Sequence, residues 1–190
     1  MEKTILEKVF EKLCYAFKEE KIDYMIIGGQ AVLYYGHPRL TEDIDITLGI
    51  DISELNKIIK ICNKNNILPL PKKIEEFVEK TYVLPCFDNE NKIRIDFIFS
   101  FFEYERKAIS RAKEVSLDNI KIKIAAIEDV IIHKIFSGRP RDIEDIRILM
   151  IINNKEKIDR KYIINWLKEF ANIPGKENLI EIFLRIEENL

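Results

Sequence analysis

Residues 28–45 read GGQAVLYYGHPRLTEDID, and the fold class can be inferred from them and the strands around them. It opens with two glycines that end the apolar run of residues 24–27, and it closes with two aspartates separated by one isoleucine. Residues 43–50 alternate polar and apolar side chains, which is the period-two pattern of a strand with one polar and one apolar face. Asp43 and Asp45 should therefore point to the same face, about 7 Å apart along the backbone.

A second alternating stretch carries another carboxylate. In residues 92–100 (KIRIDFIFS), Arg94 and Asp96 face one way and the apolar residues face the other. If the two strands are neighbours, three carboxylates converge, and this arrangement can hold one or two metal ions for phosphoryl or nucleotidyl transfer. Carboxylates this close repel each other, and Mg²⁺ relieves that repulsion because it prefers oxygen ligands. We predict that Asp43, Asp45 and Asp96 bind Mg²⁺ or Mn²⁺.

The glycine pair fits a phosphate-binding turn. A strand that ends in Gly28 and Gly29 before a short helix lets backbone N–H groups approach phosphate oxygens. Arg39 and Thr41 are available to hold a nucleotide or to orient the aspartates. Taken separately, a D-x-D pair on a solvated strand edge or a glycine pair in a turn is a structural feature, so the prediction depends on their combination.

The remaining pattern predicts a mixed α/β half followed by a helical tail. Residues 1–125 form the α/β core, a small mixed twisted sheet flanked by helices, and residues 126–190 form a helical region packed against it. The predicted helices cover 2–20, 30–35, 53–64, 71–80 and 102–112, and the predicted strands cover 24–29, 43–50, 81–87, 92–100 and 119–126.

The amino-acid composition of the chain limits which classes of function are possible. The chain has 190 residues, of which 47% are hydrophobic and 34% are charged, with a formal net charge of −2. Such a chain can bury a core, and its charge gives no general attraction to nucleic acid or membranes. Three widely spaced cysteines form neither a metal pattern nor a disulfide framework, and no stretch is a signal peptide or membrane span. We therefore expect buried or half-buried thiols, no membrane partner and a cytoplasmic location.

Taken together, GGQAVLYYG, RLTEDIDI and IRIDFIF resemble the nucleotidyltransferase superfamily that includes DNA polymerase beta. The resemblance covers roughly residues 22–100. It implies the nucleotidyltransferase fold, with Asp43, Asp45 and Asp96 as catalytic metal ligands and Gly28 and Gly29 beside the triphosphate of an NTP such as ATP. Many members carry a serine at or after the second glycine. The chain has Gln30 after the pair, whose amide would replace that hydroxyl.

The tail carries a second likeness, because EDVIIHKIFSGRPRDIEDI (128–146) resembles an element of the abortive-infection toxin branch of the superfamily. That resemblance implies that Lys134 reaches the nucleotide phosphates, and that Asp142 lies near the acceptor or orients Lys134 and Arg141. The structural alternative is a helix pair tied by surface ion pairs, with Asp142 facing a helix dipole. We expect Asp145 and Arg147 to be solvated.

These observations favour a Mg²⁺-dependent nucleotidyltransferase that moves NMP from an NTP to an acceptor hydroxyl. The toxin-like tail favours tRNA, another RNA or a protein as acceptor, and implies a cognate antitoxin as partner. Two alternatives stay open: a small-molecule adenylyltransferase, as in the related lincosamide and aminoglycoside enzymes, and a non-catalytic regulatory module of the same fold.

Overall fold

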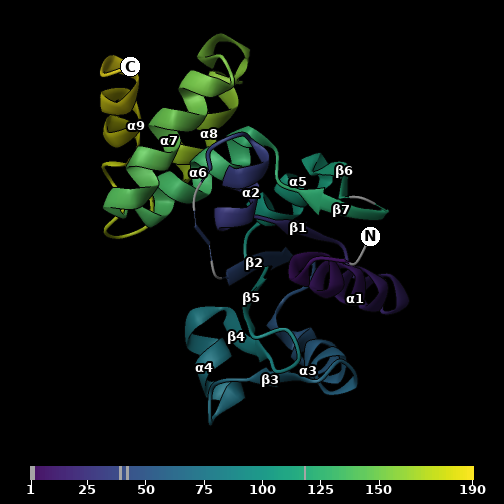
Figure 1. The fold of residues 1–190 in the computed structure, drawn as a ribbon. Helices are drawn as coiled ribbons and strands as arrows, with labels where there is room; N and C mark the ends of the chain where they lie inside the picture. The colour runs from purple at the N-terminus through teal and green to yellow at the C-terminus, as the bar shows by residue number, and fades with distance from the viewer. Residues whose placement is uncertain (1–2, 39, 42, 118) are drawn as a thin grey trace. The chain divides into compact units, whose positions relative to one another are not determined.

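The structure is a computed structural model that describes residues 3–38, 40–41, 43–117 and 119–190 (Figure 1). The chain divides into two compact units. One consists of Met1–Ile27 with Thr41–Ala125, and we call it the sheet unit. The other consists of Gly28–Leu40 with Ala126–Leu190, and we call it the helical unit. The predicted domain boundary between residues 125 and 126 stays a prediction.

The sheet unit holds a mixed sheet, as the alternating stretches predict. Within the described residues the sheet has seven strands in the order β3-β4-β5-β2-β1-β7-β6. The β2–β5 and β1–β7 pairs are parallel, and the other pairs are antiparallel. The predicted fold class, a small mixed sheet with flanking helices, is confirmed. The strands are β1 Tyr24–Ile26, β2 Asp43–Leu48, β3 Ile67–Pro69, β4 Val83–Asp88, β5 Ile93–Phe99, β6 Lys113–Leu117 and β7 Ile120–Ile124.

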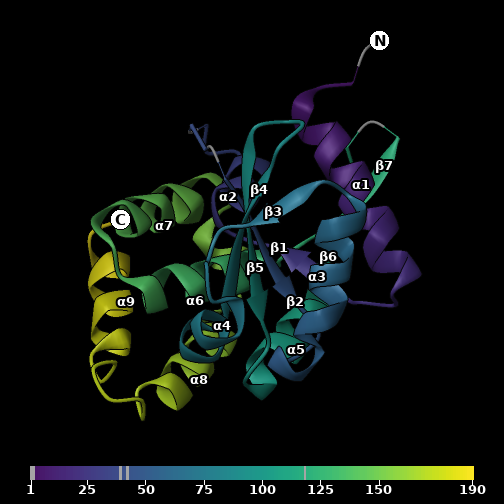
Figure 2. The same cartoon turned by 90° about the horizontal axis from the view of Figure 1, so that it is seen from below.

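One face of this sheet is the apolar core. Ile44, Ile46 and Phe97 are fully buried on it, and the ring of Phe17 from α1 packs edge-on against Phe97 with the centroids 6.2 Å apart. Helices α1 and α3 both cover this side (Figure 2). The polar face of β2 and β5 is therefore the opposite one. The helices of the unit are α1 Ile5–Glu19, α3 Leu55–Lys64, α4 Ile74–Thr81 and α5 Glu103–Arg111, with a 3₁₀ turn at Ile52–Glu54.

The cysteines are thiols of the sheet unit. Cys62 on α3 and Cys86 on β4 are fully buried, with their Sγ atoms 3.8 Å apart, and Cys14 is half-buried. The Cys62 hydrogen bond and burial raise the pKa of the Cys86 thiol. The expectation of buried or half-buried thiols is confirmed.

The helical unit is built around α6. This helix spans Ile127–Ser137 and packs against α2, α7, α8 and α9. It ends at Gly138, whose φ of 68° is the left-handed conformation that glycine adopts without strain, and Pro140 begins the next helix at its favoured first position. The other helices are α2 Gly28–Tyr34, α7 Pro140–Ile152, α8 Arg160–Phe170 and α9 Leu179–Glu188, with a 3₁₀ turn at Lys155–Lys157. Across the described residues, no helix combines the length and apolar character needed to cross a bilayer.

Candidate active site

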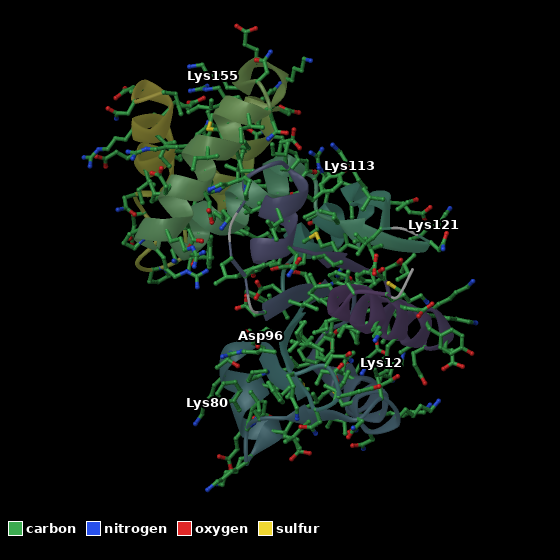
Figure 3. The ribbon with its side chains drawn as sticks, viewed as in Figure 1. Lys12, Lys80, Asp96, Lys113, Lys121 and Lys155 are labelled. Atoms are coloured by element: carbon green, nitrogen blue, oxygen red, sulfur yellow. The ribbon has the colours of Figure 1, made fainter. Side chains whose placement is uncertain are left out.

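Three aspartates share the polar face of the sheet unit. β2 and β5 run parallel as neighbours, and Asp45 lies directly opposite Asp96 in the register. Register partners point to the same side, and residues two apart on a strand do as well, so Asp43 belongs to the same face. The burial pattern agrees, because these three residues are partly exposed while Ile44 and Ile95 are buried. The prediction that the two strands are neighbours is confirmed, and Figure 3 labels Asp96 on β5.

A guanidinium group lies among these carboxylates. Arg94 Nε donates to Asp96 Oδ1 at 3.0 Å, and Arg94 Nη2 donates to Asp96 Oδ2 at 3.1 Å. Arg94 is also the register partner of Asp43. The Asp96 hydrogen bonds raise the pKa of Arg94, and the negative charges of Asp43 and Asp45 add to the shift. Sequence reasoning placed Arg94 on this face but gave it no role. Its signal was the spacing of two residues from Asp96.

Thr41 holds the first aspartate. Its Oγ1 donates to Asp43 Oδ1 at 3.0 Å, immediately before β2 begins. This contact supports the predicted orienting role of Thr41. Arg39, which was predicted to hold the nucleotide or orient the aspartates, lies outside the described residues.

The chemistry of the donor set fits a hard divalent cation, since three carboxylates offer only oxygen ligands. In the conformation described, however, no three His, Cys, Asp or Glu side chains of the described residues are placed to hold one metal ion together. In this conformation Asp96 is turned toward Arg94 and Asp43 toward Thr41.

A groove within the sheet unit is lined by Asp43 and Arg94. Its volume is about 700 Å³, within the range of small-molecule sites. Asp88 fixes the hairpin tip beside it by accepting from the Glu90 and Asn91 backbone amides and from Lys12 of α1, which Figure 3 labels. Burial alone would raise the pKa of Asp88, but the Lys12 ammonium and the Asn91 hydrogen bonds outweigh it and lower the pKa. The groove is lined by Ile5, Leu6, Asp43, Phe87, Asn91, Lys92, Ile93 and Arg94.

The helical unit contains a buried ion cluster around Lys134. Its Nζ lies 3.0 Å from Asp142 Oδ1 and 2.6 Å from Asp145 Oδ2. All three side chains are at most 7% exposed. The structural alternative of a helix pair tied by ion pairs, with Asp142 in the first turn of the second helix, describes these contacts, but the ion pairs are buried and do not lie on the surface. The expectation that Asp145 is solvated is wrong. A buried ammonium needs anionic partners, and α7 supplies two of them one helical turn apart.

The rim of this cluster includes a guanidinium and an imidazole. Arg139 Nε donates to Asp142 Oδ2 at 2.7 Å, and His37 Nδ1 lies 3.2 Å from Asp145 Oδ1. Burial alone would raise the pKa of Asp142, but its hydrogen bonds to Arg139 and Lys134 lower it below the usual value. Asp142 thus contacts Lys134 directly, as the sequence resemblance implies for an orienting residue.

The other predicted residues of the helical unit lie at the start of α2 and in the first turn of α7. Gly28 has a φ of 63°, a left-handed conformation that favours glycine at the turn out of β1. Gly29 and Gln30 are buried at the start of α2. Arg141 donates from Nη2 to the Leu40 carbonyl at 2.9 Å and thereby ties the loop to α7. Whether these residues contact a nucleotide stays a prediction.

The family follows from a sequence comparison. A model of the family described as "Nucleotidyltransferase of unknown function (DUF6036)" matches residues 4–173. The chain belongs to this nucleotidyltransferase family. The predicted superfamily and enzyme class are thereby confirmed. No curated protein matches the chain at a significant level.

Three solved structures of the same fold match this chain over most of the length of both chains. The solution structure of the antibiotic-resistance factor ANT(2'')-Ia is 15% identical, covers 90% of this chain and 96% of its own, and has a TM-score of 0.61. An antigenic nucleotidyltransferase-like protein from Paracoccidioides brasiliensis is 17% identical with coverages of 93% and 92% and a TM-score of 0.55. The lincomycin-bound lincosamide antibiotic adenylyltransferase LnuA is 18% identical with coverages of 75% and 96% and a TM-score of 0.51. At these identities the likeness shows the nucleotidyltransferase fold.

Proposed function

We propose that the chain transfers NMP from an NTP to an acceptor hydroxyl, with Mg²⁺ or Mn²⁺ held by Asp43, Asp45 and Asp96. One observation carries this proposal: Asp45 and Asp96 lie opposite each other on adjacent parallel strands, with Asp43 on the same face. The bound metal would activate the acceptor hydroxyl and neutralise charge on the α-phosphate and the leaving pyrophosphate.

Different residues of the chain would have different roles in this reaction. The three carboxylates would hold the metal, and Thr41 would keep Asp43 in its rotamer through the 3.0 Å hydrogen bond. The turn at Gly28 and Gly29 would accommodate the triphosphate, which the positive φ of Gly28 supports.

In the helical unit, we propose that Lys134 and Arg141 face the phosphates and that Asp142 orients Lys134. The direct ion pair between Lys134 and Asp142 supports the orienting role. Gln30 would add an amide contact and Arg39 a cation to the nucleotide.

The metal site is tested by nucleotide binding. Mg²⁺ with ATP should raise the melting temperature of the wild-type protein, because a ligand that binds only the folded state stabilises it by mass action. Asp43→Asn with Asp45→Asn should abolish the rise. Asp23→Asn is the matched control, since this aspartate is 73% exposed and pairs with Lys123 on the surface. An unchanged rise in the double variant would contradict the metal assignment.

For the acceptor we propose RNA, such as a tRNA end, or a protein, because of the likeness of residues 128–146 to the toxin branch. The same likeness supports a cognate antitoxin as partner. The test is incubation with each labelled NTP and a lysate, followed by nuclease or protease. If neither nuclease nor protease releases the label, because the labelled product is a small molecule, the acceptor is not a macromolecule.

A small-molecule adenylyltransferase is the second candidate. Its support is the fold likeness to ANT(2'')-Ia and LnuA together with the groove beside Asp43. Transfer of labelled AMP to an aminoglycoside or a lincosamide would favour it. A non-catalytic module would bind NTP and label nothing in any of these incubations.

A further inference from the structure

We propose that Arg94 is an internal counter-ion of the carboxylate site and must release Asp96 before a divalent cation can bind there. The inference rests on the proposed function, because it concerns the same three aspartates. It makes Arg94 a positioning residue, which sets how tightly the site binds metal, and separates it from the groups that would hold the metal.

The contacts leave Asp96 fully engaged. Its Oδ1 accepts from Arg94 Nε and its Oδ2 accepts from Arg94 Nη2, so both oxygens of the carboxylate face one guanidinium. Such two-point pairing is the strongest geometry for an arginine and a carboxylate. Both oxygens that Asp96 would offer to a metal ion are therefore occupied by Arg94. The positive charge that the site needs is already supplied by the protein.

The position of Arg94 supports the same interpretation. In the sheet register Arg94 lies opposite Asp43, one row away from the Asp45–Asp96 pair. Its guanidinium is therefore within the field of all three carboxylates, and the pKa of Arg94 is raised by each of them. With Arg94 in place the four groups sum to a charge of −2, and without it the three carboxylates sum to −3.

The Arg94 guanidinium is also exposed enough to rotate away from Asp96. The Arg94 side chain is 53% exposed while that of Asp96 is 16% exposed, so the arginine can rotate away without disturbing the strand. It borders the groove of about 700 Å³ that Phe87 and Lys92 also line. Metal binding at Asp96 is then an exchange of one cation for another, and its affinity is lowered by whatever the ion pair contributes.

Removal of the guanidinium should therefore tighten metal binding. The two-point ion pair favours the arginine-bound state of Asp96, and the negative charge uncovered by its removal also favours metal binding. We expect Arg94→Gln to bind Mn²⁺ about ten-fold more tightly than wild type, which corresponds to about 1.4 kcal/mol. Arg94→Lys keeps the charge but loses the two-point geometry, so it should bind Mn²⁺ with an intermediate affinity.

The experiment is calorimetric titration of the full chain with Mn²⁺ alone, without nucleotide and at low ionic strength. Arg106→Gln is the matched control, because Arg106 is an exposed arginine on α5 of the same unit, and its Mn²⁺ affinity should equal that of wild type. Equal or weaker binding by Arg94→Gln would overturn the inference. If Arg94→Gln does not fold, the test uses Arg94→Lys instead. An Mn²⁺ affinity of Arg94→Lys equal to or below that of wild type overturns the inference.

A separate variant distinguishes this inference from the proposed function. Asp45→Asn should abolish Mn²⁺ binding in the wild-type and the Arg94→Gln backgrounds. If Asp45→Asn abolishes binding but Arg94→Gln changes nothing, the metal site stands and the role of Arg94 is wrong. If wild type and Arg94→Gln both fail to bind Mn²⁺, the inference and the assignment of the metal site are both wrong.

Discussion

Replacement of Lys134 by methionine should destabilise the helical unit strongly. The lysine is the cation between Asp142 and Asp145, at 3.0 Å and 2.6 Å, and its side chain is 7% exposed. Methionine fills similar volume but removes the lysine between two buried carboxylates, and it leaves Arg139 at the rim as the cation that pairs with Asp142. Breaking a buried ion pair by removing one partner costs about 3–5 kcal/mol, which is a large part of the stability of an ordinary domain.

Urea unfolding measures this loss. The single tryptophan, Trp166, lies on α8, so its fluorescence reports on the helical unit. With a denaturant slope of about 2 kcal/mol/M, a loss of 4 kcal/mol lowers the urea midpoint by about 2 M. Lys161→Met is the control, since Lys161 is exposed on α8, and its midpoint should stay within about 0.3 M of wild type.

Neutralising a partner should recover part of the loss. In the Lys134→Met background, Asp145→Asn removes one of the two buried charges, and a double-mutant cycle should give a coupling of about 2 kcal/mol between these residues. If Lys134→Met lowers the midpoint by less than about 0.5 M, the ammonium is not needed to balance the aspartates, and the structural reasoning fails. The partly recovered double variant then tests function: if Lys134 faces the phosphates, this variant stays unable to bind Mg²⁺ with ATP.

Two further predictions concern stability. Burial lowers the pKa of His133 to about 4, so between pH 6.5 and pH 4 the unfolded chain binds a proton that the native state does not, and stability falls as the pH falls. From pH 7 to pH 5 the contribution of His133 should decrease by about 2 kcal/mol, and His133→Asn should remove that part of the slope; equal slopes would refute the burial argument. Thr47 on β2 is buried, and its Oγ1 has no hydrogen-bond partner among the described residues. Thr47→Val should therefore raise the free energy of unfolding by about 1 kcal/mol, and a lower melting temperature in the variant would show that the hydroxyl is satisfied.

The carboxylate site could be predicted from the sequence because strand periodicity is a local property. The alternation at Asp43 and Asp45, and again at Asp96, assigns each side chain to a face without knowledge of the partner strand. The register between the strands is not local. That Asp45 meets Asp96, and that the pairing is parallel, depends on the connection through α3, β3, α4 and β4, which the pattern of either strand does not contain.

The strands that sequence analysis missed lie at the two edges of the sheet. β3 has three residues and ends in Pro69, and β6 begins with Lys113 and Glu114. Short strands, prolines and charges are what protect an edge from further pairing. The same features remove the apolar alternation that would identify the strand. The features that protect an edge strand from pairing with another chain are thus the same features that make it hard to predict from the sequence.

The partners of Lys134, and above all the burial of Asp145, were missed for a different reason. Lys134 lies in α6, a helix that is apolar on most sides because other helices surround it, so a lysine there must have partners. The sequence supplies that requirement but does not identify the partners, and a bound phosphate or a protein carboxylate would satisfy it equally. Asp145 and Asp142 provide two carboxylates where one would balance the charge. That excess of negative charge is offset at the rim by Arg139, which pairs with Asp142. The cluster is therefore complete as a structural unit, and a catalytic role for Lys134 would require a nucleotide to displace at least one of its two aspartates.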